Sequence, residues 1–436
     1  RRRPPRRRHG NGLRRRLPLK QAPPKKRSAR LSSSISPFPV FFSPAFFSCF
    51  PFAVFSSPPS LFFPLVFATF SPDLALSYPE IDIVCRGEGE ESIAILCDRL
   101  AKCQDYTDIP NLWIKRNDGS LIENKLKLVD INKNPLIDLS IFEEARFYRP
   151  MGGKVYKMFP VETVRGCPYT CTYCNSPVQI EMYKKEICKP FFRIKKIDKI
   201  KEEILFYKDD MGAEYLYFWS DTFLAWPDNI FNDFVEMYKK IKLPFWCQTR
   251  IETLDYDKVK KLKDIGCARM SFGIEHGNEE FRKKILKRNI TNKEIIDKLK
   301  IVDEVGITYS VNNIIGFPGE TYELAFDTIE LNRNINAADR NAYPFAPFHG
   351  TPLREECERL RYVKRGQLVD SFVAEGSILD MPQFTRKQVN ALAKTFNMYV
   401  KFPKARWPEI KQAEPDTVEA NKIYEKLKQE FVEKYF

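Results

Sequence analysis

Three cysteines within eight residues are the strongest chemical signal in the sequence: Cys167, Cys171 and Cys174, in the spacing C-x-x-x-C-x-x-C. Three thiolates on one loop can converge on a cubic iron-sulfur cluster, whereas a structural zinc site usually closes with a fourth Cys or His. No fourth ligand follows nearby in the sequence, so one iron would keep an open position, as catalysis requires. A zinc knuckle or a chance trio is the alternative interpretation.

The elements around this loop alternate between strand-like and helix-like segments. The strand-like segments are Met158–Val164, Tyr215–Trp219, Phe245–Thr249, Arg269–Ile274, Tyr309–Ile315 and Asn341–Phe345. The helix-like segments are Ile197–Lys208, Asp228–Lys240, Asp257–Asp264, Asn278–Leu286, Lys293–Val305 and Glu320–Leu331. Six βα repeats predict an α/β fold, a partial (β/α)6 TIM-like barrel of parallel strands. Its active site should lie at the carboxyl ends of the strands, where the cysteine loop begins.

The loop resembles the defining C-x-x-x-C-x-aromatic-C motif of the radical S-adenosylmethionine (SAM) superfamily, with Tyr173 at the aromatic position. This resemblance implies that the three cysteines bind a 4Fe-4S cluster whose open iron chelates the amino and carboxylate groups of SAM. Reductive cleavage then yields methionine and a 5'-deoxyadenosyl radical. Later strand ends, such as the run from Ser271 to Gly277, resemble the branch that carries cobalamin-binding domains and contains class B methylases and anaerobic cyclases.

The resemblance also implies roles in cofactor binding for residues at other strand ends. Those residues are Tyr173, Ser220, Asp221, Arg250, Glu275 and Gly316. Tyr173 would pack by the adenine of SAM, and Ser220 and Asp221 would hold its amino group. Arg250 and Glu275 would face its carboxylate and ribose. The alternatives are a helix cap for Ser220 and Asp221, a mutual or local salt bridge for Arg250 and Glu275, and a plain turn for Gly316.

Two histidines beside these motifs, His276 and His349, are expected to be structural rather than metal ligands, because no other ligand-type residue accompanies either. The catalytic residue that acts on the substrate stays unassigned.

The segment Ile81–Lys102 reads as a strand, a Gly-x-Gly turn and a helix. It resembles the last strand and turn of the family's Rossmann-like cobalamin-binding domain. The family's Asp-x-His-x-x-Gly loop, whose His binds cobalt, has no counterpart, and His9 is the only upstream histidine. We therefore expect a truncated unit, and cobalamin bound weakly or not at all.

Between this unit and the barrel, residues 110–150 read as a strand pair around the turn at 117–120, followed by a linker that contains Pro135 and Pro150.

Charge is concentrated at the start of the chain. Residues 1–30 hold 14 of the 71 Lys and Arg and no acid, which leaves 57 basic residues to face 57 acidic ones. A domain that binds nucleic acid should carry a basic excess, so we expect no nucleic-acid partner for the folded body. The odd number of cysteines, 11, is not a disulfide framework, and a reducing compartment such as the cytoplasm is expected.

No charged residue occurs from Leu31 to Pro72, a stretch rich in Phe, Ser and Pro. The prolines argue against a membrane-spanning helix, although the segment also resembles a transit or signal sequence. We expect four parts: a low-complexity, disordered leader (1–67), the truncated Rossmann-like unit with its linker (68–150), the radical SAM core (151–350) and a helical extension (351–436).

The expected function is a radical SAM enzyme that methylates or rearranges an unactivated carbon of a small molecule, natural product, lipid or tetrapyrrole. Its partners would be that substrate and a reductant such as flavodoxin or ferredoxin. One rival is a tRNA methylthiotransferase, which would need a second set of three cluster cysteines. Cys85, Cys97 and Cys103 are wrongly spaced for that. Another is a non-catalytic metal-binding protein whose basic leader binds nucleic acid or membrane.

Overall fold

A seven-stranded sheet is the central element of the computed structural model, which describes residues 62–63, 66–369 and 376–435. Its strand order is β13-β12-β11-β10-β9-β6-β5, in which β5 pairs antiparallel with β6 and all other neighbours are parallel. The strands are β5 (Tyr148–Met151), β6 (Lys154–Val161), β9 (Tyr215–Phe218), β10 (Phe245–Thr249), β11 (Cys267–Glu275), β12 (Thr308–Ile315) and β13 (Asp339–Pro344). The predicted partial barrel of parallel strands is confirmed.

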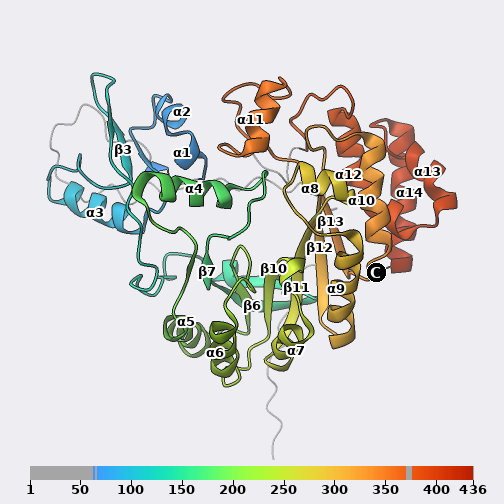
Figure 1. Ribbon diagram of the computed structural model, residues 1–436, viewed down its shortest axis with the longest axis horizontal. Coiled ribbons are helices and arrows are strands. Elements are labelled where there is room, and N and C mark those ends of the chain that lie inside the picture. Colours follow the sequence, from blue (N-terminus) through green and yellow to red (C-terminus); the bar gives the residue numbers. More distant parts are fainter. Residues whose placement is uncertain (1–61, 64–65, 370–375, 436) are drawn as a thin grey trace, which may run out of the picture. The chain divides into compact units, whose positions relative to one another are not determined.

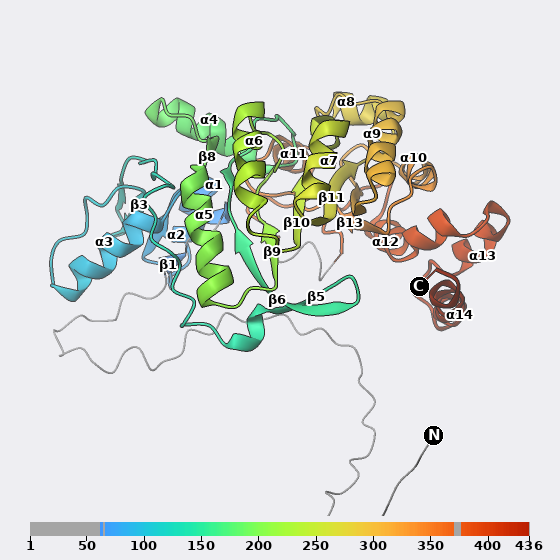
Figure 2. The ribbon, with the colours of Figure 1, turned by 90° about the horizontal axis from the view of Figure 1, so that it is seen from below.

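Helices cover one face of this sheet (Figures 1 and 2). They are α5 (Ile197–Leu205), α6 (Asp228–Tyr238), α7 (Tyr256–Asp264), α8 (Glu279–Lys284), α9 (Asn292–Val305) and α10 (Tyr322–Arg333), with a π-helical turn at Phe206–Asp210. Met270 and Phe272 of β11 join the core formed with Leu299 and Val302 of α9. Because side chains alternate along a strand, Arg269, Ser271 and Gly273 face the opposite, concave side of the sheet.

A small four-stranded sheet precedes the barrel, in the order β1 (Phe62–Phe63), β2 (Ile83–Cys85), β3 (Leu112–Lys115) and β4 (Leu121–Glu123). Helix α3 (Glu90–Ala101) follows β2, as the strand-turn-helix pattern predicts. Strand β1 pairs in parallel with β2, and α1 (Val66–Phe70) begins before residue 68. The predicted end of the leader at residue 67 is therefore too late. The rest of the leader prediction, residues 1–61 and 64–65, lies outside the described residues.

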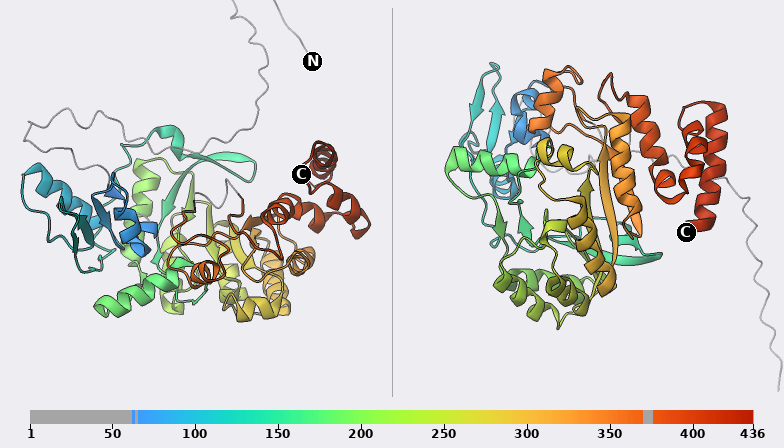
Figure 3. Two further views of the ribbon diagram at one scale, coloured as in Figure 1. Left: turned by 90° about the horizontal axis from the view of Figure 1, so that it is seen from above. Right: turned by 45° about the vertical axis from the view of Figure 1, so that its right-hand side comes forward.

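The C-terminal residues form helices, as predicted: α11 (Pro352–Arg359), α12 (Arg386–Lys401), α13 (Trp407–Gln412) and α14 (Val418–Tyr435). Figure 3 shows α12 and α14 stacked outward from the barrel strands. Leu392 and Phe396 of α12 share a second core with Ala325 and Ile329 of α10, so the extension packs on the helix layer of the barrel.

One local expectation needs correction. Pro150 lies in strand β5 rather than in a linker, and β5 is an edge strand, where a residue without an N–H is tolerated. No described helix combines the length and apolar character that a membrane crossing requires.

Candidate active site

The cysteine loop begins where a short strand, β7 (Val164–Arg165), ends against β8 (Arg193–Ile194). Gly166 starts the loop with φ of 85°, and a Cβ there would lie 3.0 Å from the Phe191 side chain and 3.2 Å from the Phe192 Cα. Only glycine suits this conformation and this approach. The loop ends at Cys174, the residue that precedes α4 (Asn175–Ile187).

All three cysteines line one cavity of about 240 Å³ on the concave side of the barrel, at the carboxyl ends of its strands, which we call the cluster cavity. Its lining is Cys167, Cys171, Tyr173, Cys174, Asp221, Thr222, Gln248, Thr249, Arg250, Ser271, Gly273, Glu275, Arg288 and Asn312. Within the described chain, no three His, Cys, Asp or Glu side chains converge on one metal-ion position. A cubane does not need this convergence, because each thiolate binds a separate iron.

The thiols already have polar partners that suit ligands. Arg250 Nη1 donates to Cys171 Sγ at 2.9 Å, and Thr222 Oγ1 lies 3.3 Å from Cys167 Sγ. Burial raises the pKa of Cys174 to about 12 and also raises that of Cys167. Hydrogen bonds and a nearby cation would stabilise the sulfur charge of a bound cluster. The donor set therefore fits three-cysteine ligation of a 4Fe-4S cluster.

Two arginines and two glutamates form an ion network along one wall of the cluster cavity. Arg288 donates to Glu275 at 3.1 Å and to both carboxylate oxygens of Glu252 at 3.2 Å, and Arg250 also pairs with Glu252. Burial raises the pKa of Glu275, whereas the Arg288 and Arg250 charges outweigh burial at Glu252 and lower its pKa. Arg250 and Glu275 each form a local salt bridge, with Glu252 and Arg288 respectively. Among the described ion pairs, none joins Arg250 to Glu275 directly.

Glu275 has an unusual backbone conformation, with φ of 70°. The register of β11 and β12 shifts between Gly273 and Glu275, which marks a bulge. Bulges and left-handed non-glycine residues often re-aim a side chain at a functional site. Here the Glu275 carboxylate lies beside position 273, where a Cβ would come within 2.0 Å of Oε1. A side chain at position 273 would therefore displace the Glu275 carboxylate from this place.

Two of the predicted cofactor residues lie elsewhere. Ser220 Oγ accepts from the Thr163 and Val164 N–H groups at 3.4 and 3.3 Å, so its hydroxyl fixes the approach to the cysteine loop. The Gly316 N–H donates to Glu320 Oε2 at 2.6 Å, and neither residue lines the cluster cavity. The helix-cap alternative is also wrong for Ser220 and Asp221, because the next helix, α6, is preceded by Pro227.

The other predicted residues reach the cavity. Asp221 accepts from Ser176 Oγ at 2.8 Å, and burial raises the pKa of its carboxyl group. Tyr173, also in the lining, packs edge-on against Phe317. Both histidines have structural partners, as expected: His276 contacts Glu320 at 3.0 Å and His349 contacts Ser71 at 2.9 Å.

A second cavity, of about 310 Å³, lies between the turn after β2 and the barrel. Gly87, Glu88, Gly89 and Glu90 line one side, and Glu162, Arg165, Trp219 and Asp221 are on the other. The Glu88 carboxylate, 4% exposed, binds Arg165 at 2.6 Å and Arg193 at 2.5 Å. Asp221 lines both cavities, so the two are neighbours.

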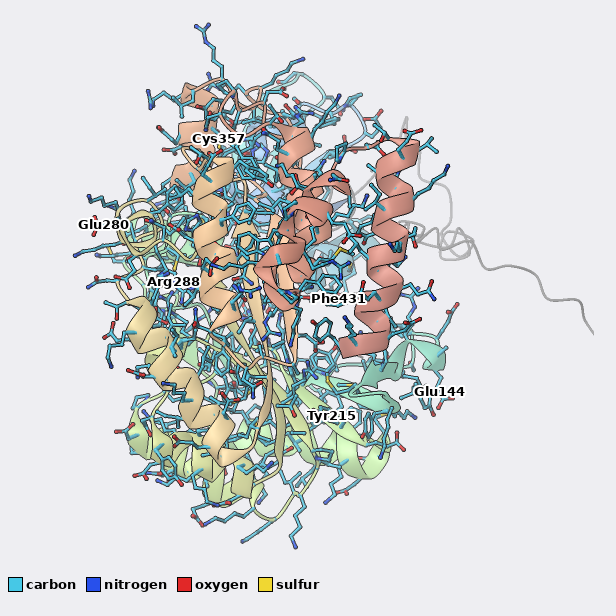
Figure 4. The ribbon with its side chains drawn as sticks, turned by 90° about the vertical axis from the view of Figure 1, so that its right-hand side faces the viewer. Glu144, Tyr215, Glu280, Arg288, Cys357 and Phe431 are labelled. Carbon is cyan, nitrogen blue, oxygen red and sulfur yellow. The ribbon has the colours of Figure 1, made fainter. Side chains whose placement is uncertain are left out.

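Sequence reasoning did not find several lining residues, above all Arg288 and Thr222. Arg288 lies in the loop after α8, 13 residues beyond Glu275, where no motif marks it. Thr222 directly follows Asp221, and this position next to a predicted cofactor residue could have indicated that it lines the cavity. Figure 4 labels Arg288 among the side chains beside the barrel strands.

Comparison with known proteins gives a domain-level match: residues 161–331 match the family model described as the radical SAM superfamily. The uncharacterized methyltransferase PH0819 of Pyrococcus horikoshii is 25% identical over 345 residues, which cover 77% of this chain and 70% of that protein. A tRNA-2-methylthio-N(6)-dimethylallyladenosine synthase of Sulfurihydrogenibium is 25% identical over 259 residues, 57% of this chain and 54% of that protein.

Among solved structures, the radical SAM methyltransferase TsrM of Kitasatospora setae, with cobalamin and a 4Fe-4S cluster bound, matches with a TM-score of 0.57. The match has 14% identity and covers 84% of this chain and 80% of TsrM. At this identity the likeness supports the fold, which agrees with the barrel and with the small sheet before it.

Proposed function

From the radical SAM domain that residues 161–331 form, we propose that this enzyme binds a 4Fe-4S cluster through Cys167, Cys171 and Cys174. When bound and reduced, that cluster supplies the electron that splits SAM into methionine and a 5'-deoxyadenosyl radical. The observation that carries the proposal is the convergence of three loop thiols on one cavity at the carboxyl ends of the barrel strands. A flavodoxin or ferredoxin is the proposed electron donor.

The charged residues of the cluster cavity are proposed to orient SAM. Arg250 and Arg288 supply the positive charge that a carboxylate needs, and Glu275 and Asp221 supply acceptors for an ammonium group and ribose hydroxyls. The buried Nε atoms of both arginines have no hydrogen-bond partner. Unused donors beside the cavity are consistent with a polar ligand there.

Tyr173 is proposed to pack against the adenine, since it lines the cluster cavity together with the three thiols. Ser220 and Gly316 are proposed to act indirectly. The first fixes the segment before the cysteine loop, and the second closes the turn that Glu320 holds. No role in contact with SAM is proposed for these two residues.

Methyl transfer to carbon in a small molecule is the proposed reaction. The Pyrococcus relative is named a methyltransferase and covers more of this chain than the methylthiotransferase-type relative does. The rival reaction needs a second cluster from three further cysteines. In the described structure Cys85 is buried in β2, whereas Cys97 and Cys103 are exposed on α3 and just after it. These thiols do not form a second cluster site.

Cobalamin is proposed as the methyl carrier, on the strength of relatives such as TokK of Streptomyces tokunonensis, a cobalamin-dependent radical SAM methyltransferase that is 32% identical over 104 residues. The proposed place for part of it is the cavity between Gly87–Glu90 and the barrel, next to Asp221. Both described histidines are held by other side chains, so no described histidine is free to bind cobalt.

Anaerobic reconstitution followed by reduction in the presence of SAM tests the main proposal. The expected result is about four irons per chain and formation of 5'-deoxyadenosine, with both lost when the three loop cysteines are changed to Ala. Tight zinc binding without iron uptake would refute it.

Equilibrium dialysis against hydroxocobalamin tests the carrier. Stoichiometric retention at micromolar concentration is expected if the proposal holds, and Trp219→Ala, a change beside the 310 Å³ cavity, should weaken it. If this protein retains no more hydroxocobalamin than a control protein that does not bind it, the result would support the sequence-based expectation of weak binding.

A further inference from the structure

A third cavity, of about 470 Å³, lies at the opposite end of the barrel strands from the cysteines, and we call it the basal cavity. It is lined by Pro150, Met151, Gly152, Arg269, Ser310, Ala338, Asp339, Arg340, Asn341, Asn397, Lys401, Phe431 and Tyr435. These residues come from the first residues of β11, β12 and β13, from the β5–β6 turn and from helices α12 and α14. Figure 4 looks onto this side of the molecule and labels Phe431 of α14.

Positive charge at the basal cavity exceeds negative charge. Arg269 pairs with Asp339, the only acid in the lining. Arg340, 6% exposed, donates only to main-chain oxygens, those of Ala337 at 2.7 Å, Ile335 at 2.5 Å and Asn332 at 3.4 Å. Among the described residues its charge therefore has no carboxylate partner, although the three main-chain oxygens engage all three of its side-chain nitrogens.

Lys401 adds a second cation without an acid. Lys401 is exposed, its Nζ lies 5.7 Å from the centre of the Tyr435 ring, and no described acid pairs with it. Burial and the neighbouring Arg340 both lower the pKa of Lys401, as expected for a cation next to an uncompensated cation. An oxyanion placed between the two would relieve both.

The basal cavity is joined to the cluster cavity by a wall of neutral polar side chains on the concave side of the sheet. Ser310 Oγ donates to Ser271 Oγ at 3.1 Å, Asn312 Nδ2 donates to the same oxygen at 3.1 Å, and Asn341 Nδ2 donates to Asn312 Oδ1 at 2.9 Å. Ser271 and Asn312 line the cluster cavity, whereas Ser310 and Asn341 line the basal one.

The distance between the two cavities is similar to the length of a small metabolite. Arg269 and Ser271 are two residues apart on β11, a rise of ~7 Å. A molecule of several carbons that lies against this wall would reach from the basal cations to the cavity of the thiols. The wall offers hydroxyl and amide groups rather than hydrocarbon, so it favours a polar body over an alkyl chain.

We propose that the basal cavity binds the oxyanion group, a carboxylate or phosphate, of a small polar molecule whose remainder lies along the Ser310–Ser271–Asn312–Asn341 wall toward the cluster cavity. The identification of this molecule as the substrate rests on the proposed function. The binding site itself does not. A lipid tail or a large apolar macrocycle is the wrong class for this wall.

Equilibrium dialysis of the full-length, reconstituted and oxidised protein without SAM tests the site, with labelled inorganic phosphate and labelled malonate as probes. Whichever probe binds more tightly identifies the oxyanion. Lys401→Met should weaken that binding about tenfold, the effect of losing one charge-assisted hydrogen bond. The matched control is Lys422→Met, which removes an exposed lysine of α14 that lines no part of the basal cavity.

A second pair of probes tests the wall. Sorbitol 6-phosphate and hexyl phosphate have six carbons each, and only the first can use the serine and asparagine side chains. Tighter binding of sorbitol 6-phosphate than of inorganic phosphate is expected, and Asn341→Leu should remove the gain. Equal or tighter binding of hexyl phosphate would overturn the polar wall as a recognition element.

Failure of this inference is distinguishable from failure of the proposed function. Protein that forms 5'-deoxyadenosine but binds neither phosphate nor malonate, or binds them equally well after Lys401→Met, refutes the basal site alone. Protein that binds an oxyanion through Lys401 but does not cleave SAM refutes the proposed function alone.

Discussion

The two ends of the barrel differ in whether their cations are all paired with carboxylates. In the cluster cavity, Arg250 and Arg288 are paired with Glu252 and Glu275. In the basal cavity, within the part of the chain that the structure describes, Arg340 donates only to main-chain oxygens and the exposed Lys401 contacts only the Tyr435 ring. A compensated cation is held in place by its partners and orients what binds beside it, whereas an uncompensated one is available to an incoming anion.

The largest effect is expected at the thiols that the compensated network surrounds. Changing Cys167, Cys171 and Cys174 together to Ala should abolish iron and sulfide incorporation, because no other described side chain replaces three ligands of a cubane. Iron analysis and visible absorbance measure this. Cys188→Ala, at the end of α4, is the control and should retain the full iron content.

Next in size is the network itself. Arg288→Met should destabilise the protein by about 3 kcal/mol, since it leaves the Glu275 carboxylate without its arginine and takes one of two arginines from Glu252. Urea unfolding followed by circular dichroism gives the number. Lys284→Met, which breaks only an exposed pair with Glu280, should leave the midpoint unchanged. If Arg288→Met lowers the unfolding free energy by less than ~1 kcal/mol, the buried glutamates do not depend on the Arg288 charge.

A smaller effect is expected for a single hydrogen bond to sulfur. The Thr222 hydroxyl donates to the Asp221 oxygen at 2.8 Å and lies 3.3 Å from Cys167 Sγ, and a ligand thiolate there can only accept its proton. Thr222→Val removes this donor and should lower the midpoint potential of the reconstituted cluster by some tens of millivolts. The direction follows because hydrogen bonds to sulfur favour the more negative, reduced cluster, and 59 mV corresponds to about tenfold for one electron. Redox titration followed by electron paramagnetic resonance measures it.

Thr395→Val is the control for that measurement. This threonine is buried in α12, where its hydroxyl bonds the Ala391 oxygen at 3.0 Å, away from the cluster cavity. An equal shift in both variants would mean that the Thr222 hydroxyl has no specific role.

The smallest effect, and the one that sets the two cavities apart most directly, is expected at Lys401. In anion-free buffer Lys401→Met should leave the unfolding free energy unchanged or raise it by up to about 0.5 kcal/mol, because it removes a cation beside Arg340. With 50 mM phosphate present, the wild-type chain should gain stability and the variant should not. A clear loss of stability without phosphate would show that Lys401 has a compensating partner after all.

The barrel was predictable from the sequence because its strands are apolar runs and its helices have clear amphipathic spacing. All six predicted strand segments correspond to β6 and β9–β13, with ends that differ by a few residues. The first of them runs three residues past Val161, since β6 ends there and Val164 belongs to the separate strand β7.

The site was predictable only where a local motif marks it. Cys167, Cys171 and Cys174 were found from spacing within one loop. Arg288 was not, because its partners Glu252 and Glu275 come together only when β10 and β11 pair. Ser220 and Gly316 do not line the cluster cavity, and the sequence could not show this, since adjacency to a strand end does not say which way a side chain or N–H group turns.

The basal cavity had no sequence signal. Arg269, Ser310 and Lys401 are separated by long stretches of chain, and they meet because the sheet register aligns two strands and α12 packs beside β13. Strand β1 was missed because Phe62 and Phe63 lie in a stretch whose composition resembles low-complexity sequence.

Glu88 connects the small sheet to the start of the cysteine loop. The Glu88 carboxylate accepts hydrogen bonds from Arg165, Arg193 and the Val129 N–H. The Glu88 main-chain N–H donates to the Tyr183 hydroxyl of α4 at 3.0 Å. Separating the two parts would expose one carboxylate and two guanidinium groups at once. The small sheet should therefore not open as an independent lid, and in hydrogen exchange the amides of β2 and β7 should share a single opening free energy.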